Sequence, residues 1–398
     1  MEKLAVFGGT PVFEKKIGYG HQYIDENDIR AVTKVLRSDF LTCGPEIERT
    51  EEKLRRITGA KYAVLVSNGT AALHAACYAA GIGDGDEVIT TPITFAASAN
   101  CALYLGGKPV FADIDPETYN IDPDSVEAHI TPRTRAVVAV DFTGQAVQLN
   151  RIREICAAHS LTLIEDAAHS LGTRYQGKAI GSLADMTTFS FHPVKTCTAG
   201  EGGAITTNDD AFYKRLTLFR AHGITRNPDW MERAPEGGWC YEQVALGLNY
   251  RMTDMQAVLL GSQLDKLEQF VRRRREIVER YNAAFSDTPG VIVQKEIPES
   301  ETARHLYLLQ LDTARVSCTR KEAYDALQAE GVGCNVHYIP VYWFPYYEKL
   351  GYRRELCPNA EKLYERLITI PLYYGMTDSD ADGVIYAVKK VLSHYRRE

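Results

Sequence analysis

The chain has 398 residues, 45% of them hydrophobic and 24% charged, which is typical of an ordinary globular protein. Its net charge of −7 gives no reason to expect a nucleic-acid partner, and no apolar run of about 18 residues predicts a membrane span. Nine cysteines without a CxxC pair, and a polar N-terminus unlike a secretory signal, favour reduced thiols in a cytoplasmic protein, with no disulfide frame and no metal site.

Short β-rich runs alternate with helical patterns through the first half of the chain. The predicted strands cover residues 64–66, 87–90, 109–114, 136–141, 161–166, 186–191 and 203–207. Their nearly continuous apolar sequences predict a sheet that is buried on both faces between helices. The sequence therefore predicts an α/β domain with a mostly parallel seven-stranded sheet, whose active groups lie at the carboxyl ends of its strands.

The pattern changes after a long predicted helix over residues 254–285. Strands are predicted at 305–311 and 333–338, and helices at 321–330 and 378–394. This mixed order predicts a smaller α+β domain. We expect residues 1–286 to form an N-terminal segment and the large domain, and residues 287–398 to form the small C-terminal domain. The first 45 residues are expected to pack against both domains.

Lys195 and Asp166 are the candidate catalytic residues. Lys195 follows the apolar run 186–191 and precedes a glycine-rich turn at 199–203, while Asp166 ends the run 161–166. A desolvated lysine can condense with an aldehyde and transfer protons, and a buried carboxylate can pair with a protonated pyridine nitrogen. Both groups are required by pyridoxal phosphate chemistry. The alternatives are a surface charge for Lys195 and a helix N-cap for Asp166.

A phosphate site is predicted where the run 64–66 passes into a helix. Gly69, Thr70 and Ala71 begin that helix, whose free N–H groups and dipole favour a bound phosphate. An ordinary N-cap turn would look similar. Ser190 could add a hydroxyl, and Asn249 is a further polar candidate at the start of a helix.

Two more residues are candidates for contact with a cofactor ring. Phe95 follows a predicted strand and could stack on the ring, although a phenylalanine is more often part of the core. His169 could brace Asp166, or it could simply cap and pack. No GxGxxG motif follows a strand, so a nicotinamide or flavin site is not supported.

Together these motifs resemble those of a known family. They occupy residues 67–73, 165–169, 190–195, 199–203, 249–256 and 336–340. With them the chain resembles, nearly end to end, the sugar-nucleotide aminotransferases of the DegT/StrS type, a branch of the fold-type I pyridoxal phosphate transferases. A related dehydratase branch has histidine at the lysine position, so Lys195 favours amino transfer.

The resemblance implies roles for the candidate residues. Lys195 would bind the cofactor aldehyde, and Asp166 would pair with the pyridinium. The resemblance places Thr70, Ala71 and Ser190 around the phosphate and Phe95 over the ring. Gly69 and His169 stay candidates for cofactor contact from the sequence pattern, and Asn249 is a further one. The resemblance also implies a homodimer with shared active sites, in which Asn249 reaches the phosphate bound by the neighbouring subunit.

Within the family the chain is most similar to the transaminases of pseudaminic acid biosynthesis, on residues 19–22, 38–45, 141–145 and 192–195. This implies transfer of an amino group from glutamate to C4 of a UDP-linked 4-keto-6-deoxy-N-acetylhexosamine. By analogy, the sugar nucleotide would contact Tyr19, Asp39, Phe40, Leu41, Thr42, Asn249, Val336, His337, Tyr338 and Ile339. Two alternatives stay open: a dTDP- or GDP-linked keto-deoxysugar as substrate, and a non-catalytic sensor of sugar nucleotides.

Overall fold

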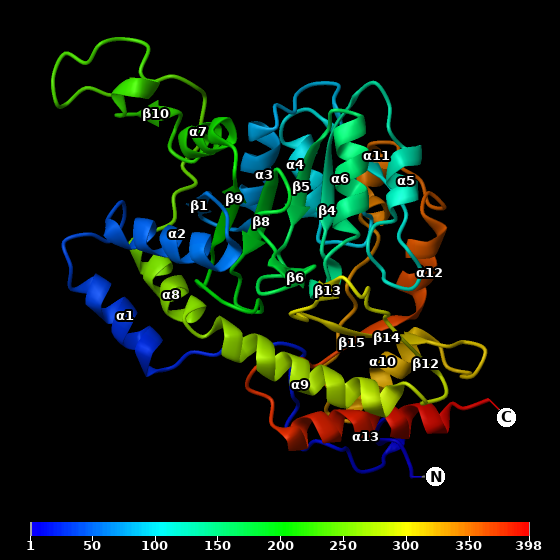
Figure 1. Cartoon of the computed structure of the whole chain (residues 1–398). Helices are drawn as coiled ribbons and strands as arrows, with labels where there is room; N and C mark the ends of the chain where they lie inside the picture. Colours follow the sequence, from blue (N-terminus) through cyan, green and yellow to red (C-terminus); the bar gives the residue numbers. More distant parts are fainter. Residues whose placement is uncertain (1, 398) are drawn as a thin grey trace.

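A seven-stranded sheet organises the N-terminal part of the chain in the computed structural model, which describes residues 2–397 (Figure 1). The strand order is β1-β9-β8-β5-β4-β2-β3, and every neighbouring pair is parallel except the two pairs that β9 makes. The strands are β1 (Tyr62–Val66), β2 (Glu87–Thr90), β3 (Lys108–Phe111), β4 (Thr134–Val140), β5 (Thr162–Asp166), β8 (Met186–Ser190) and β9 (Gly203–Thr207). The predicted mostly parallel α/β fold is confirmed.

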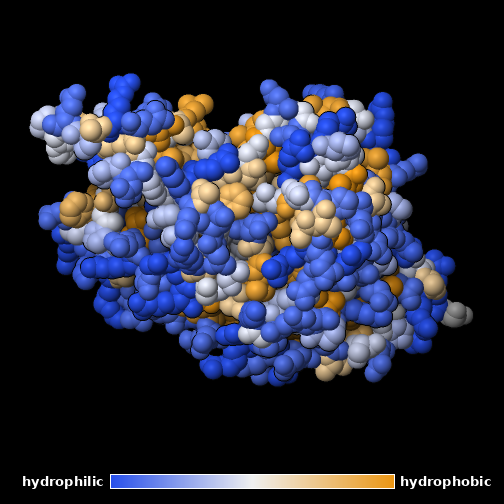
Figure 2. Space-filling model, turned by 45° about the horizontal axis from the view of Figure 1, so that its top comes forward, coloured by the Kyte–Doolittle hydropathy of each residue, from blue (hydrophilic) through white to orange (hydrophobic). Residues whose placement is uncertain are grey.

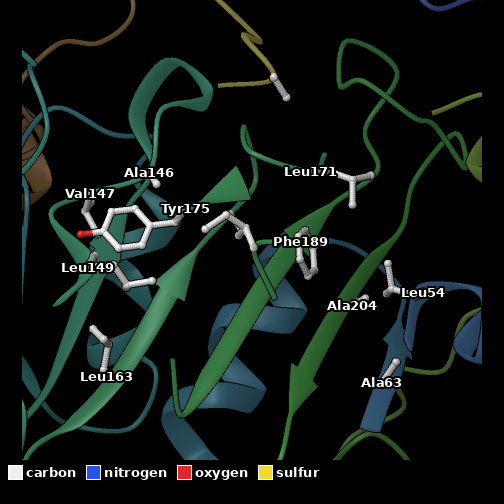
Figure 3. Packing of buried hydrophobic residues seen from close by; sticks show 14 of the residues in the cluster. Leu54, Ala63, Ala146, Val147, Leu149, Leu163, Leu171, Tyr175, Phe189 and Ala204 are labelled. Carbon is white, nitrogen blue, oxygen red and sulfur yellow. The ribbon is translucent and has the colours of Figure 1, made fainter. Parts of the chain in front are cut away.

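Helices cover both faces of this sheet, because successive side chains along a strand point to opposite faces. In β4, Ala136 and Val138 pack in one apolar cluster, while Val137 and Ala139 pack in another. The first face is covered by α3 (Gly69–Ala79), α4 (Ala97–Leu103) and α7 (Asp210–Phe219). The second face is covered by α2 (Pro45–Thr58), α5 (Pro123–Ala128), α6 (Leu149–Ala158) and α8 (Asp254–Leu264), and Figure 3 shows part of its packing.

A second core lies in the C-terminal part of the chain. It is built on an antiparallel sheet of β12 (Val291–Val293), β14 (Tyr307–Leu311) and β15 (Leu367–Ile370), with α9 (Leu267–Phe285), α10 (Arg320–Ala329) and α13 (Asp378–His394). This agrees with the predicted small α+β unit. The boundary at residue 287 stays a prediction, because Leu4 and Tyr281 from the other side of it also pack into this core.

Shorter elements complete the fold. They are η1 (Ala5–Phe7), α1 (Glu26–Leu36), η2 (Phe142–Gly144), β6 (Arg174–Tyr175), β7 (Lys178–Ala179), β13 (Ser300–Glu301), η4 (Val341–Trp343), α11 (Pro345–Lys349) and α12 (Pro358–Arg366). The N-terminal segment contacts both parts of the molecule, as expected: Leu4 lies in the C-terminal core, and the buried Asp28 of α1 accepts a hydrogen bond from Ser262 of α8 at 2.6 Å. Among the helices of residues 2–397, none combines the length and hydrophobicity needed to cross a bilayer.

Two predicted elements differ from the structure. The helix expected over 254–285 is interrupted at Lys266, whose ammonium group lies 2.7 Å from the buried carboxylate of Asp28. The strand expected over 333–338 forms only a single bridge, between Asn335 and Thr369. Periodicity predicted both elements, but it carries no information about contacts with residues distant in the sequence.

An arm projects from the body of the molecule between α7 and α8 (Figure 1). It contains β10 (Ile224–Thr225), η3 (Pro228–Trp230) and β11 (Glu242–Gln243). Trp239 and Leu246 are 73% and 79% exposed on this arm. Figure 2 shows hydrophobic residues at the surface of the molecule among a hydrophilic majority.

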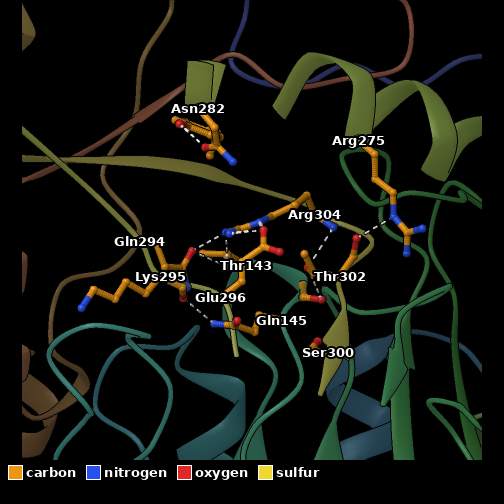
Figure 4. A network of polar contacts seen from close by, with 12 residues as sticks. Thr143, Gln145, Arg275, Asn282, Gln294, Lys295, Glu296, Ser300, Thr302 and Arg304 are labelled. Atoms are coloured by element: carbon orange, nitrogen blue, oxygen red, sulfur yellow. Dashed lines mark hydrogen bonds and ion pairs between the residues drawn. The ribbon is translucent and has the colours of Figure 1, made fainter. Parts of the chain in front are cut away.

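A polar network joins the loop after β4 to the segment that leads into β14 (Figure 4). The buried Arg304 donates hydrogen bonds to Gln294 and, at 2.6 Å, to Glu296. The amide of His305 donates to the carbonyl of Thr143 at 2.7 Å. These bonds fix the start of β14 against the carboxyl ends of the large sheet.

Candidate active site

Lys195 lies on the loop between β8 and β9, beyond the carboxyl end of β8. The loop closes on itself through backbone bonds from Phe191 N to Gly202 O at 2.8 Å and from Lys195 N to His192 O at 2.9 Å. Asp166 ends β5, the neighbour of β8. Parallel strands end at one edge of a sheet, so the fold brings these two residues together as the sequence predicted.

Burial changes the chemistry of the Lys195 amine. The side chain is half-buried, and desolvation lowers the pKa of Lys195 to about 8, while the charge of Asp166 raises it. An ammonium group loses its proton more readily when it is removed from water. Lys195 is therefore suited to act as a nucleophile and a base near neutral pH.

Asp166 is a buried carboxylate with few partners. It is 4% exposed, and it accepts hydrogen bonds from the hydroxyl of Ser98 at 2.7 Å and from the amide of Ala168 at 3.2 Å. Burial raises the pKa of Asp166, whereas those two bonds and the charge of Lys195 lower it. A turn follows Asp166, not a helix, so the helix N-cap alternative does not hold.

Neutral aromatic side chains border the amine. The Nε2 atom of His169 lies 3.3 Å from the hydroxyl of Tyr338, and the rings of His169 and His305 lie 4.6 Å apart. Burial, together with the charge of Lys195, holds the pKa of His169 well below its usual range. For His337 the same two causes lower the pKa to about 4. These histidines are neutral hydrogen-bonding groups at physiological pH.

The predicted phosphate residues also meet. A Cβ atom on Gly69 would lie 2.8 Å from the Cβ of Ser190, so the start of α3 and the end of β8 are in direct contact. The amides of Gly69 and Thr70 have no acceptor within residues 2–397. The amide of Ala71 already donates to the side chain of Asn68 at 2.8 Å. The amides of Gly69 and Thr70, together with the hydroxyl groups of Thr70 and Ser190, therefore remain open toward an anion at this point.

Phe95 is not a core residue. Its side chain is 64% exposed in the loop after β2, and its ring lies 6.5 Å from that of Tyr338. Tyr19 belongs to the same group, because its ring lies 5.2 Å from that of His337. Val336 and Ile339 flank His337 and Tyr338 along the chain, and Ile339 is 39% exposed.

The other predicted residues are exposed and, in the described part of the chain, make no hydrogen bond to the groups around Lys195. Asp39, Phe40, Leu41 and Thr42 are exposed on the loop before α2, where the carbonyl of Leu41 accepts a hydrogen bond from the amide of Asp254 at 3.0 Å. Asn249 is exposed at the base of the arm, where it pairs with Ala221. Among the hydrogen bonds of residues 2–397, none joins these residues to Lys195, Asp166 or His169.

Two residues near the site were missed by sequence reasoning. Ser98 donates to Asp166, and His305 packs against His169. Neither carries a sequence signal of its own, because Ser98 lies in an apolar helix and His305 lies just before the apolar strand β14. Only their contacts in the structure, Ser98 with Asp166 and His305 with His169, identify them as residues of the site.

Comparison with known proteins gives a consistent result. The model of the DegT/DnrJ/EryC1/StrS aminotransferase family matches residues 22–389. The spore coat polysaccharide biosynthesis protein SpsC of Bacillus subtilis is 42% identical over 376 residues, covering 94% of this chain and 96% of that protein. The UDP-4-amino-4,6-dideoxy-N-acetyl-beta-L-altrosamine transaminase of Campylobacter jejuni is 36% identical over 384 residues, covering 96% and 99%.

Solved structures agree with these sequence matches. The aminotransferase PseC of Helicobacter pylori, involved in pseudaminic acid biosynthesis, has a TM-score of 0.89 at 32% identity, covering 96% of this chain and 100% of that one. A putative sugar aminotransferase of Streptococcus pneumoniae in its pyridoxal phosphate form has a TM-score of 0.87 at 30% identity, covering 95% and 99%.

Members of this family are pyridoxal phosphate-dependent transaminases, so the predicted cofactor and enzyme class are confirmed and the sensor alternative is not supported. The chain belongs to the DegT/DnrJ/EryC1/StrS aminotransferase family.

Proposed function

We propose that this aminotransferase moves the amino group of glutamate to C4 of a UDP-linked 4-keto-6-deoxy-N-acetylhexosamine, a precursor of pseudaminic acid. The placement of Lys195 and Asp166 at the carboxyl end of the large sheet, where their charges interact, carries the proposal for the chemistry. The likeness to the Campylobacter jejuni transaminase and to PseC supports the choice of sugar.

The residues around Lys195 fit pyridoxal phosphate. Asp166 is a buried anion to which only two donors are bonded within residues 2–397, and it suits a protonated pyridine nitrogen. The open amides of Gly69 and Thr70 beside Ser190 suit the phosphate, and the exposed ring of Phe95 suits a stacked pyridine. When bound, the cofactor supplies an aldehyde that accepts the amino group and a ring that withdraws electrons.

In this proposal Lys195 carries the protons of the reaction. Its lowered pKa lets it accept a proton from the α-carbon of glutamate and deliver one to C4 of the sugar. Asp166 stays ionised beside the ring nitrogen, helped by its bonds from Ser98 and Ala168. The neutral side chain of His169 adds a hydrogen-bonding group without adding charge.

We also propose a homodimer in which a second copy completes each site. Asn249 and the loop with Asp39 and Thr42 would then contact the ligands bound by the partner, while Tyr19 and His337 serve their own subunit. The exposed apolar residues of the arm support this proposal, because large apolar side chains such as Trp239 favour burial in an interface. A cytoplasmic location is supported by the nine unpaired cysteines in the described chain.

A panel of keto sugars tests the proposed substrate. The enzyme is incubated with ¹⁵N-glutamate and with UDP-, dTDP- or GDP-linked 4-keto-6-deoxysugars, and the label is followed into the product by mass spectrometry and NMR. We expect the label at C4 of the UDP-linked N-acetylhexosamine. Lys195→Ala is the control without turnover. Borohydride reduction and peptide mapping should find the reduced cofactor attached to Lys195. Attachment of the cofactor to another residue would refute the assigned chemistry.

A second candidate keeps the chemistry and changes the sugar. The Bacillus subtilis protein named for spore coat polysaccharide biosynthesis is 42% identical to this chain, against 36% for the altrosamine transaminase. This favours a keto-deoxysugar nucleotide of a different polysaccharide route as the alternative substrate. Preferential labelling of a dTDP- or GDP-linked sugar in the same panel would select this alternative.

A further inference from the structure

Two buried hydroxyl groups lie behind the Asp166 carboxylate. The Oγ atom of Ser98 lies 2.7 Å from Oδ2 of Asp166, and the Oγ1 atom of Thr94 lies 2.8 Å from the Oγ of Ser98. Thr94, Ser98 and Asp166 are only 3%, 1% and 4% exposed. Thr94 and Ser98 take no direct part in the proton transfers proposed for Lys195.

The row has a single direction. A serine hydroxyl has one proton, and an ionised carboxylate can only accept hydrogen bonds. The hydroxyl of Ser98 therefore donates its hydrogen bond to the Asp166 carboxylate. The hydroxyl of Thr94 must then donate a hydrogen bond to the Ser98 oxygen. Thr94 in this way restricts the rotation of the Ser98 hydroxyl and keeps it directed at the carboxylate.

The same turn also presents Phe95. The amide of Ser98 donates to the carbonyl of Phe95 at 3.1 Å, and α4 begins at Ala97 within this turn. The ring of Phe95 is 64% exposed, whereas its neighbours Thr94 and Ser98 point into the protein. One turn thus places an aromatic ring on the open side of the site and a hydrogen-bond donor on the buried side.

The charges around Asp166 make this donor important. Lys195 faces the carboxylate with an opposite charge, and the ionisable groups of Asp141, Cys101 and Tyr338 also interact with it. Burial raises the pKa of Asp166, and the hydrogen bond from Ser98 is the strongest of the effects that lower it. Without that bond, protonation of the carboxylate would become easier.

We propose that Ser98 is a positioning residue: held by Thr94, its hydroxyl orients the Asp166 carboxylate so that the carboxylate accepts the ring N–H of the bound cofactor. The proposal rests on the role proposed above for Asp166. It assigns a function to the turn between β2 and α4 that goes beyond the display of Phe95.

Cofactor binding to the cofactor-free enzyme tests this inference without an activity assay. The dissociation constant of pyridoxal phosphate is measured by absorbance titration between about pH 6 and pH 9 for the wild type, Ser98→Ala, Thr94→Ser and Thr90→Val. A hydrogen bond to a charged group is strong, so we expect Ser98→Ala to weaken binding about tenfold or more. The loss should grow as the pH falls, because the pKa of Asp166 rises without its donor.

The other variants are matched controls. Thr94→Ser keeps the outer hydroxyl and should bind like the wild type. Thr90→Val removes a different buried hydroxyl, which donates to the carbonyl of Val138 at 2.9 Å, and should leave both the affinity and its pH profile unchanged. Circular dichroism and thermal unfolding confirm that each variant is folded.

Asp166→Asn separates the two proposals. If Asp166→Asn weakens binding while Ser98→Ala binds like the wild type, the role of Ser98 is wrong and the proposed function stands. An unchanged affinity in Asp166→Asn would overturn the roles of both residues. Equal losses of cofactor affinity in Ser98→Ala and Thr90→Val, without a shift in the pH profile, would show that either substitution disturbs the surrounding structure. This outcome would also refute the role of Ser98.

Discussion

The lowered pKa of Lys195 leads to a quantitative prediction for the cofactor-free enzyme. With a pKa of about 8, against an ordinary 10.5, about a quarter of the Lys195 amines are neutral at about pH 7.5. An ordinary lysine would be only about 0.1% neutral under the same conditions. Lys195 should therefore react with a small neutral acylating reagent about two hundred times faster than an amine of the same intrinsic nucleophilicity that has the ordinary pKa.

Competitive labelling measures this difference. Cofactor-free enzyme is treated with a trace of isotopically labelled acetic anhydride at a series of pH values, denatured, acetylated completely and digested. The isotope ratio of the peptide that contains Lys195 then reports the reactivity of that amine alone, and the exposed lysines of the same sample serve as internal references. We expect a midpoint near pH 8 for Lys195.

Asp166→Asn tests the cause of the shift. Desolvation lowers the pKa of Lys195 and the negative charge of Asp166 raises it. Removal of that charge leaves desolvation unopposed, so the midpoint should move to a lower pH. A midpoint near the ordinary lysine value in the wild type, or a move to higher pH in Asp166→Asn, would refute the reasoning.

Three further predictions concern activity and stability. Lys195→Ala should abolish transamination in the ¹⁵N assay and retain the circular dichroism spectrum of the wild type; transamination that persists would contradict the role of the amine. Gly69→Ala places a methyl group 2.8 Å from the Cβ of Ser190 and should lower the free energy of unfolding by about 1–3 kcal/mol in urea titrations, whereas an unchanged midpoint would mean that the contact relaxes freely. Glu330 is fully buried and pairs with Lys390 at 2.9 Å, so Glu330→Ala should cost about 3–5 kcal/mol in denaturant unfolding. The double variant Glu330→Ala/Lys390→Met should recover much of that lost free energy of unfolding. No recovery would show that the unpaired charge of Lys390 is not the cause of the loss.

Local sequence patterns predicted the large domain well. The apolar runs that became β4, β5 and β8 are buried on both faces, so their residues had to be apolar whatever their neighbours were. The interruption at Lys266 could not be predicted in this way. Lys266 there pairs with the buried carboxylate of Asp28, which lies far away in the sequence, and a local pattern does not show such a contact.

The candidate site was predicted in part for the same reason. Gly69 and Ser190 come from different motifs, and the parallel sheet brings their strand ends to one edge. Asn249 and Asp39 are exposed on the surface of a single chain. Their predicted contacts stay proposals that depend on a second subunit.

The sequence by itself determined the α/β fold, the order of the strands along the chain and the two groups of opposite charge, Lys195 and Asp166, because apolar runs and short motifs are local properties. Only the tertiary structure decided how those groups behave. Burial sets the pKa of Lys195, and the hydroxyl of Ser98 reaches Asp166 from a helix that is 68 residues away in the chain. Desolvation and hydrogen bonding depend on what surrounds a group in space, and a linear pattern does not contain that information.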